Sequence, residues 1–343
     1  MNDVARTLRI RPTTAAMQEP VDYDYFVPKD PANLLRQDPA RRTAVKFRSA
    51  GLTLAGHLYR PGRSNAQTPA IIMVGPISSV KEQTVPHYAQ RFADAGYTVL
   101  TFDSRSFGES EGAVRWHYDP NEIIDDYSNA VSYLLGRTDI DSTRIALVGV
   151  CMGGGYAVSA AARDRRIRAV ASIAGGYDIG GTFQRFLGAE GFANYFRAIN
   201  ELVGRQYRAG EVEYIPTIAK ALSASVPIAA MPNPEAYAYY DRTSKADAPN
   251  WSNRITAASL QPYFIYNSIA HAPLVAPTPL LIVHGTKDLA LLPEYAQAAY
   301  DAAVGPKELI WIETHNHIEL YDQDPYVSEA CRRVLAWLEP HMK

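Results

Sequence analysis

A strand, a sharp turn and a helix are predicted in succession over residues 144–157. Ile145 to Val148 is a short apolar run, typical of a strand buried on both faces. It leads into Gly149-Val-Cys-Met-Gly153, and a run of small residues typical of a helix follows. This is the nucleophile-elbow pattern Gly-x-Ser-x-Gly with cysteine at its centre. The two glycines are expected where strand and helix approach too closely for a Cβ atom, around a central residue with a strained backbone.

Cys151 is therefore the predicted nucleophile. Its side chain is expected to project clear of the sheet at a helix N-terminus, where the helix dipole favours a thiolate. The alternative is a buried structural cysteine in a glycine-rich turn, which a five-residue pattern does not exclude. A dinucleotide-binding loop is set aside, because a Gly-x-Gly-x-x-Gly motif that starts at Gly153 needs glycine where the chain has Val158.

Composition narrows the class of protein. The 343 residues exceed the usual size of a single core, so one large domain with an insertion, or two domains, is expected. Apolar residues make up 47% and charged residues 20%, as in ordinary globular proteins. The net charge of −2 gives no reason to expect nucleic acid or an anionic membrane surface as a partner. With two cysteines, no metal-ligand spacing, no apolar leader and no membrane-length apolar run, we expect a cytoplasmic protein without metal or cofactor.

Strands alternate with helices on both sides of a long irregular stretch. A hairpin is predicted from residues 43–48 and 52–59. Buried strands are predicted at 68–74, 97–102, 145–148, 167–173, 279–284 and 307–312. Helices are predicted at about 83–95, 121–135, 293–304 and 325–338. This alternation predicts an α/β protein with a mostly parallel central sheet flanked by helices.

Two segments lie outside that pattern. Residues 1–42 are polar and interrupted by prolines, which indicates an N-terminal arm with a short helix at 31–37. Residues 175–277 carry many aromatic side chains and no clear buried strand, and the runs 194–206 and 217–223 look helical. We interpret 175–277 as an inserted, mostly helical lid on a catalytic body formed by 43–174 and 278–343. The alternative is a separate small domain unrelated to the site.

A base and an acid for the cysteine are predicted at the ends of the two returning strands. Asp288 follows the strand at 279–284, and His317 follows the strand at 307–312. Residues just past the carboxyl ends of parallel strands line the ligand crevice of an open α/β sheet. Cys151, Asp288 and His317 occur in the order nucleophile, acid, histidine that α/β-hydrolases use.

A second histidine competes for the role of base. His315 and His317 are two residues apart, so their side chains point to opposite sides if the strand geometry persists. Spacing alone does not separate them, and His317 is preferred. Asp288 is preferred over Glu313 and Glu319 as the acid.

The oxyanion of an acyl-transfer reaction needs two preorganised N–H donors. Met152, directly after the nucleophile, is expected to supply one. The other is expected from the loop after the first buried strand, where Pro76 has no N–H and Ile77 is the natural donor. Asp103 and Arg105 are expected to brace their own loop rather than to react.

The chain resembles α/β-hydrolases of the dienelactone-hydrolase-like group. It is similar to bacterial hydrolases of poorly defined substrate and to fungal polyketide transferases of that fold. The resemblance is carried by segments 80–83, 102–110, 149–157, 284–288 and 317–322, and it covers 44–174 and 278–340. It implies an α/β-hydrolase fold with a Cys151-His317-Asp288 triad. The chain departs from the group's common His-Pro-Gly-Gly-Gly oxyanion loop, because it reads Gly75-Pro-Ile-Ser-Ser79.

The expected function is hydrolysis of a small-molecule ester, lactone or thioester through a covalent acyl-enzyme. The aromatic lid suggests a hydrophobic or aromatic substrate, although aromatic residues also build cores. Two alternatives stay open. One is an acyltransferase or cyclase that passes a polyketide-type acyl group to an alcohol or amine, and the other is a non-catalytic ligand binder on a hydrolase fold.

Overall fold

The computed structural model describes residues 28, 31–62 and 67–343. Most of the predicted N-terminal arm therefore lies outside the described residues. The short helix expected at 31–37 was wrong beyond its first turn, because only a 3-10 helix at Pro31–Asn33 is present. Leu34 instead forms a β-bridge with Gln323, and the Leu35 N–H donates to the Asp322 carbonyl at 2.8 Å. A second 3-10 helix follows at Pro39–Arg41.

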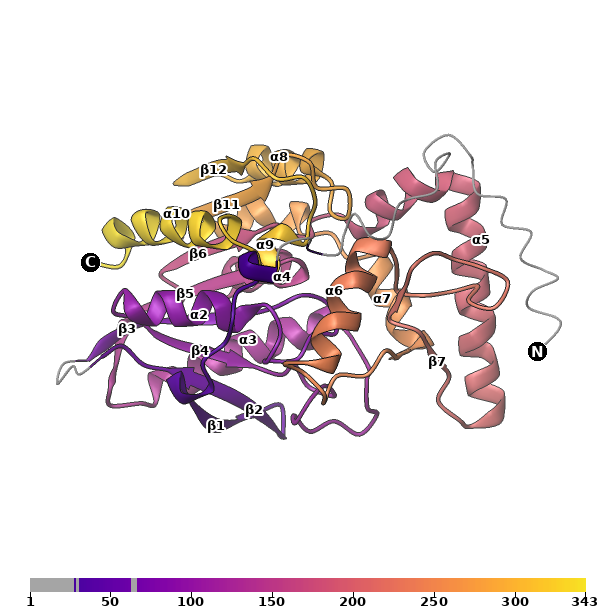
Figure 1. The fold of residues 1–343 in the computed structure, drawn as a ribbon, viewed down its shortest axis with the longest axis horizontal. Coiled ribbons are helices and arrows are strands. Elements are labelled where there is room, and N and C mark those ends of the chain that lie inside the picture. The colour runs from indigo at the N-terminus through magenta and orange to yellow at the C-terminus, as the bar shows by residue number, and fades with distance from the viewer. Residues whose placement is uncertain (1–27, 29–30, 63–66) are drawn as a thin grey trace.

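One eight-stranded sheet forms the centre of the protein, in the order β1-β2-β4-β3-β5-β6-β11-β12 (Figure 1). The strands are β1 (Arg42–Ser49), β2 (Leu52–Tyr59), β3 (Thr68–Val74), β4 (Thr98–Phe102), β5 (Ile140–Val150), β6 (Ala169–Ile173), β11 (Leu280–Gly285) and β12 (Lys307–Ile312). Strand β2 runs antiparallel to β1 and β4, and every other neighbouring pair is parallel. The predicted fold class, α/β with a mostly parallel sheet, is confirmed.

Helices cover both faces of this sheet (Figure 1). They are α2 (Val85–Asp94), α3 (Pro120–Leu135), α4 (Met152–Arg163), α8 (Pro293–Ala302), α9 (Glu319–Asp322) and α10 (Tyr326–His341). Helix α3 packs beside α4, and α10 packs beside α2. In α3 the buried side chains Ile123, Tyr127, Val131 and Leu134 recur at helical spacing, so one stripe of the helix faces the core.

The stretch between β6 and β11 gathers at one end of the sheet (Figure 1). Its helices are α5 (Ile179–Ala209), α6 (Pro234–Lys245) and α7 (Leu260–Phe264), with 3-10 helices at Ala257–Ser259 and Ile269–Val275. Helix α5 bends at Gly188, whose φ is 69°. A continuous cluster of buried apolar side chains joins this stretch, through residues such as Tyr195 and Phe264, to the core around the sheet. The division into arm, body and lid stays a prediction.

One expectation for this stretch was wrong. It contains four two-residue strands, paired as β7 (Tyr214–Ile215) with β10 (Ile255–Thr256) and β8 (Ile218–Ala219) with β9 (Met231–Pro232). The helix expected at 217–223 is absent. The Asn253 side chain accepts from the Ile218 N–H at 2.8 Å and donates to the Ile218 carbonyl at 3.1 Å, so it takes the backbone groups that a helix would use.

Within the described residues, no helix combines the length and the apolar character needed to cross a bilayer.

Candidate active site

Cys151 lies between β5 and α4 with φ 58° and ψ −127°, a conformation that non-glycine residues rarely adopt. A Cβ at Gly149 would lie 2.0 Å from the Gly153 carbonyl oxygen, and one at Gly153 would lie 2.2 Å from the Val74 carbonyl oxygen. The expected close approach at both glycines is therefore confirmed. The Cys151 N–H donates to the Ile173 carbonyl at 3.0 Å, which ties the turn to the end of β6.

Asp288 and His317 meet at the carboxyl ends of β11 and β12. His317 Nδ1 is 2.5 Å from Asp288 Oδ2, and Nδ1 carries the proton because a carboxylate only accepts. The other oxygen, Oδ1, accepts from the N–H groups of Ala290 at 2.9 Å and Leu291 at 2.8 Å. The acid is thus fixed by its own turn, and it fixes the tautomer and orientation of the imidazole.

The charged forms of His317 and Asp288 stabilise each other inside the protein. Burial opposes the charged form of His317, but the Asp288 carboxylate and its hydrogen bond raise the pKa of His317 well above its ordinary value. Burial likewise opposes ionisation of Asp288, and the neighbouring His317 holds the pKa of that carboxyl below its usual range. The pair therefore favours an imidazolium next to a carboxylate.

His315 lies in a different environment from His317. Its side chain is 59% exposed, its backbone N–H donates to Glu319 at 2.7 Å, and its ring lies 3.2 Å from the same carboxylate. The two histidines therefore point in different directions, and only His317 contacts Asp288.

The Cys151 side chain lies close enough to His317 and Tyr321 to raise the pKa of each. Cys151 is 4% exposed and His317 is 3% exposed, so this arrangement is enclosed. The buried rings of Tyr118, Tyr240 and Tyr263 also lie close enough to interact electrostatically with Cys151. The surroundings of the thiol are therefore aromatic and largely dry.

Ile77 lies on the loop after β3 and Met152 is the first residue of α4, and the two segments pack together because Gly153 contacts the end of β3. Among the described residues, neither backbone N–H donates to a protein acceptor. The loop that carries Ile77 is held by the stretch between β6 and β11. The Tyr240 hydroxyl donates to the Ile77 carbonyl at 2.7 Å, and the Trp251 indole N–H donates to the Ser78 carbonyl at 3.1 Å.

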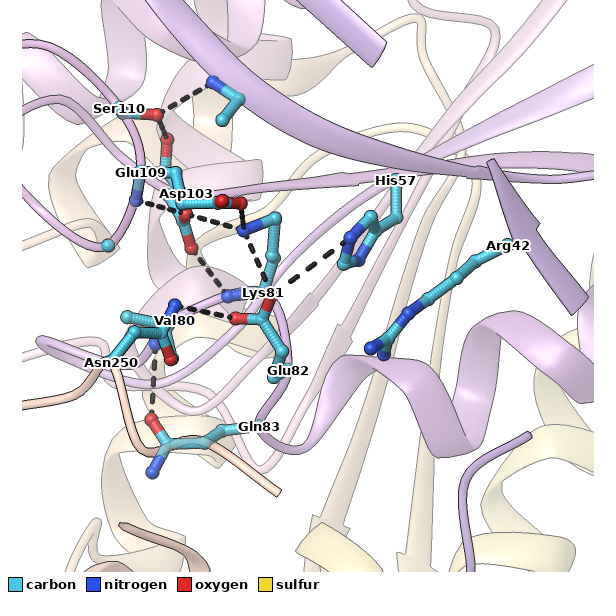
Figure 2. Close-up of polar contacts among 12 residues, drawn as sticks. Arg42, His57, Val80, Lys81, Glu82, Gln83, Asp103, Glu109, Ser110 and Asn250 are labelled. Atoms are coloured by element: carbon cyan, nitrogen blue, oxygen red, sulfur yellow. Dashed lines mark hydrogen bonds and ion pairs between the residues drawn. The ribbon is translucent and has the colours of Figure 1, made fainter. Parts of the chain in front are cut away.

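A buried ionic cluster lies directly after this loop (Figure 2). The Lys81 side chain is 1% exposed, and its Nζ lies 3.0 Å from Asp103, 2.9 Å from Glu82 and 2.5 Å from Glu109. Asp103 also accepts from the backbone N–H groups of Lys81 at 2.7 Å and Glu109 at 2.9 Å. Asn250 donates to Glu82 at 3.3 Å from the other side. The cluster thus joins three segments that are distant in sequence.

The bracing role expected of Asp103 and Arg105 is correct for the first residue only. Asp103 bonds within its loop and to Lys81. Arg105 does not brace its own loop, because its guanidinium bonds the buried carboxylate of Asp126 on α3 at 2.7 Å. A planar guanidinium favours such a multiply bonded carboxylate over scattered loop carbonyls.

Sequence reasoning missed Glu235, the second residue of α6. Its carboxylate accepts from the His317 N–H at 2.5 Å and from the Ile318 N–H at 3.4 Å. A glutamate in a first helical turn normally indicates only a favourable helix terminus, so nothing in the sequence distinguishes this one. Its partner lies 82 residues away. Helix α6 therefore contributes directly to the position of the His317 backbone.

Glu235→Gln is expected to change how stability depends on pH. Burial raises the pKa of Glu235 to about 7, and His317 opposes that rise. The unfolded value is about 4.3, so the folded chain holds the proton more tightly, and this contribution to stability is lost as pH rises from about 4.3 through 7. The loss is on the order of 3 kcal/mol.

Urea unfolding from pH 4.5 to 8 checks this expectation. The free energy of unfolding of the wild type, relative to that of Glu235→Gln, should fall across that range. The difference between the wild type and the exposed control Glu294→Gln should stay constant. A constant difference between wild type and Glu235→Gln would contradict it.

The described residues include no group of three or more His, Cys, Asp or Glu side chains arranged to hold a metal ion. A small cavity lies behind the loop after β3, and its lining includes Phe107, Tyr118 and Tyr156.

The fold is that of an α/β-hydrolase. The crystal structure of the α/β-hydrolase GrgF from Penicillium sp. sh18 superposes with a TM-score of 0.74 at 24% identity, over 88% of this chain and 99% of that chain. Residues 50–319 match the family described as X-Pro dipeptidyl-peptidase (S15 family), and the chain belongs to that family. The superfamily and the enzyme class expected from the sequence are confirmed.

Curated relatives include proteins of known and unknown role. The uncharacterized protein YcjY of Escherichia coli is 31% identical over 81% of this chain and 91% of its own length. The thiohydrolase aneE of Aspergillus aculeatus is 30% identical over 78% of this chain and 83% of its own length. The polyketide transferase claH of Penicillium crustosum is 28% identical over 77% of this chain and 86% of its own length. The resemblance to bacterial proteins and fungal polyketide transferases is thus confirmed.

Proposed function

We propose that this protein hydrolyses an ester, lactone or thioester of a small hydrophobic or aromatic molecule through an acyl-enzyme on Cys151. The observation that carries the proposal is the buried His317–Asp288 hydrogen bond next to the thiol at the elbow. The Cys151 thiolate attacks the carbonyl carbon, and His317 gives its Nε2 proton to the leaving group as the old acyl bond breaks. Water then attacks the thioester while its proton passes to His317 Nε2, and the C–S bond breaks to release the acid and restore the thiolate beside the imidazolium.

The Ile77 and Met152 N–H groups are the proposed oxyanion donors, each worth roughly 3 kcal/mol in the transition state. The buried tyrosines near Cys151 support a hydrophobic or aromatic acyl group. The relative named as a thiohydrolase supports the thioester among the candidate substrates.

Acyl transfer to an alcohol or amine is the second candidate. A thioester keeps the acyl group reactive towards such acceptors, and a relative is named as a polyketide transferase. The enclosed thiol favours this candidate as well, because few water molecules reach it.

The proposal is tested by locating the acyl group. Wild-type protein is mixed with p-nitrophenyl hexanoate, quenched within the first turnovers, digested and analysed by tandem mass spectrometry. The hexanoyl mass is expected on the peptide that contains Cys151 and not on the peptide with Cys331, whose pKa is raised strongly by burial. Turnover without any acyl group on Cys151, or a stable unmodified thiol with no turnover across esters and thioesters, would overturn the proposal.

A further inference from the structure

His284, near the end of β11, is a fully buried histidine that takes no part in the acyl chemistry proposed above. Its side chain is 0% exposed. Its Nε2 lies 2.8 Å from the Leu291 carbonyl oxygen, and because a carbonyl only accepts, Nε2 carries the proton of the ring. The other nitrogen, Nδ1, is buried and has no hydrogen-bond partner among the described residues, which fits the unprotonated nitrogen of a neutral imidazole.

The protonated nitrogen of His284 also faces the acid of the site. Nε2 is 3.4 Å from Asp288 Oδ2, the oxygen that His317 Nδ1 contacts at 2.5 Å. The other carboxylate oxygen, Oδ1, accepts from the N–H groups of Ala290 and Leu291. N–H groups therefore face both oxygens of Asp288, an arrangement that favours the charged form of a buried carboxylate.

His284 faces this carboxylate as a neutral ring. Burial lowers the pKa of His284, although Asp288 opposes this effect. The neighbouring rings are those of Trp311 on β12 and of Tyr177, with centroids 6.1 Å and 6.3 Å away. Burial raises the pKa of Tyr177 well above its ordinary value, so this neighbour is uncharged as well. Asp288 and His317 are thus the ionisable groups whose charges act on His284, which offers them an N–H dipole rather than a second positive charge.

We propose that His284 is a positioning residue of the acid–base pair, whose Nε2–H stabilises the negative charge on Asp288 Oδ2 and so limits how tightly the pair holds the proton of His317. The inference deepens the proposed function and rests on it, because it takes Asp288 and His317 as the acid and the base. His317 has to release its Nε2 proton to the leaving group, and an imidazolium held too tightly by its carboxylate is a weaker acid.

The test follows the proton of His317 directly, in a protein that cannot be acylated. Cys151→Ala is used as the background, because Cys151 is one of the groups that raise the pKa of His317. In ¹⁵N-histidine-labelled protein, the ring nitrogens of His317 are titrated by NMR from pH 5 to pH 10. The signals of His317 are those absent from a His317→Gln variant.

The variants separate the N–H group of His284 from its packing. His284→Phe and His284→Leu both remove the N–H, with and without an aromatic ring in its place, and either one suffices if the other does not fold. His284→Gln places an amide N–H near the position of Nε2. His87, on α2, is a second buried histidine whose pKa burial lowers to about 3, so His87→Leu controls for the loss of a packed neutral imidazole.

Removal of the N–H in His284→Phe or His284→Leu is expected to raise the pH at which His317 loses its proton by about 0.5–1 unit. A fully formed hydrogen bond to a charged group would give more, but the contact is 3.4 Å long. His284→Gln is expected to return the midpoint to that of the Cys151→Ala protein, and His87→Leu to leave it unchanged.

A midpoint that is unchanged or lower without the N–H would overturn the inference. So would a rise that His87→Leu shares or that His284→Gln does not reverse, since lost packing would then explain it. Retention of the His317 proton up to pH 10 in every variant, the Cys151→Ala protein included, would contradict the inference too, because the pair would hold the proton tightly with His284 in place. These proteins lack Cys151, so the titration is separate from the acyl-labelling experiment, whose failure would overturn the proposed function itself.

Discussion

Replacing Asp288 by asparagine is expected to lower kcat for ester turnover by about 10⁴-fold while the fold is kept. The wild-type carboxylate uses Oδ1 for the N–H groups of Ala290 and Leu291 and Oδ2 for His317. An asparagine carbonyl can keep the two backbone bonds, which turns its NH₂ group towards His317 Nδ1. That nitrogen must then accept, so the proton moves to Nε2 and the imidazole can no longer take the proton of the Cys151 thiol.

The measurement is kcat for p-nitrophenyl hexanoate with wild type, Asp288→Asn and a control, Asp119→Asn. Asp119 caps the N-terminus of α3 by accepting from the Asn121 N–H at 2.8 Å, and asparagine caps equally well. The control should therefore keep wild-type activity. A loss of less than tenfold in Asp288→Asn, with its thermal unfolding unchanged, would show that another group orients His317.

The central sheet and the elbow could be predicted from the sequence because their signals are local. The glycines at 149 and 153 mark a backbone approach that excludes any Cβ, and that constraint identifies the elbow before any contact is known. Asp288 and His317 follow strongly apolar strands, and parallel strands bring their carboxyl ends to one edge. Pattern and chain order were therefore sufficient to find residues that meet in the structure.

The contacts that complete the site could not be predicted in this way. The His317 loop is held by Glu235 and the loop that carries Ile77 by Tyr240 and Trp251, and these contacts span 82 to 173 residues. The two-residue strands of the same stretch are too short to give any periodicity, so residues 217–223 were mistaken for a helix. Sequence periodicity reports which face of an element is buried, and it does not report which partner covers that face.

Lys81 is another residue whose partners the sequence pattern does not reveal, and these partners affect the stability of the protein. A lysine in a loop is normally solvated, yet Lys81 is enclosed by three carboxylates, and Asp103, Glu82 and Glu109 together raise its pKa against the effect of burial. Burial raises the pKa of Asp103 to about 6, although Lys81 opposes this. The ammonium therefore compensates a fully buried carboxylate (Figure 2).

Lys81→Met is expected to lower the free energy of unfolding by about 3–5 kcal/mol at pH 8, because Asp103 is left as an uncompensated buried charge. The cost should shrink at pH 5. Without Lys81 the pKa of Asp103 rises above 6, and a carboxyl with a raised folded pKa loses its stabilising contribution as pH rises through that value. Urea unfolding at both pH values checks this, with the exposed Lys46→Met as control. A cost that is equal at pH 5 and pH 8 would mean that lost packing of the lysine chain, rather than the uncompensated buried charge of Asp103, determines the effect.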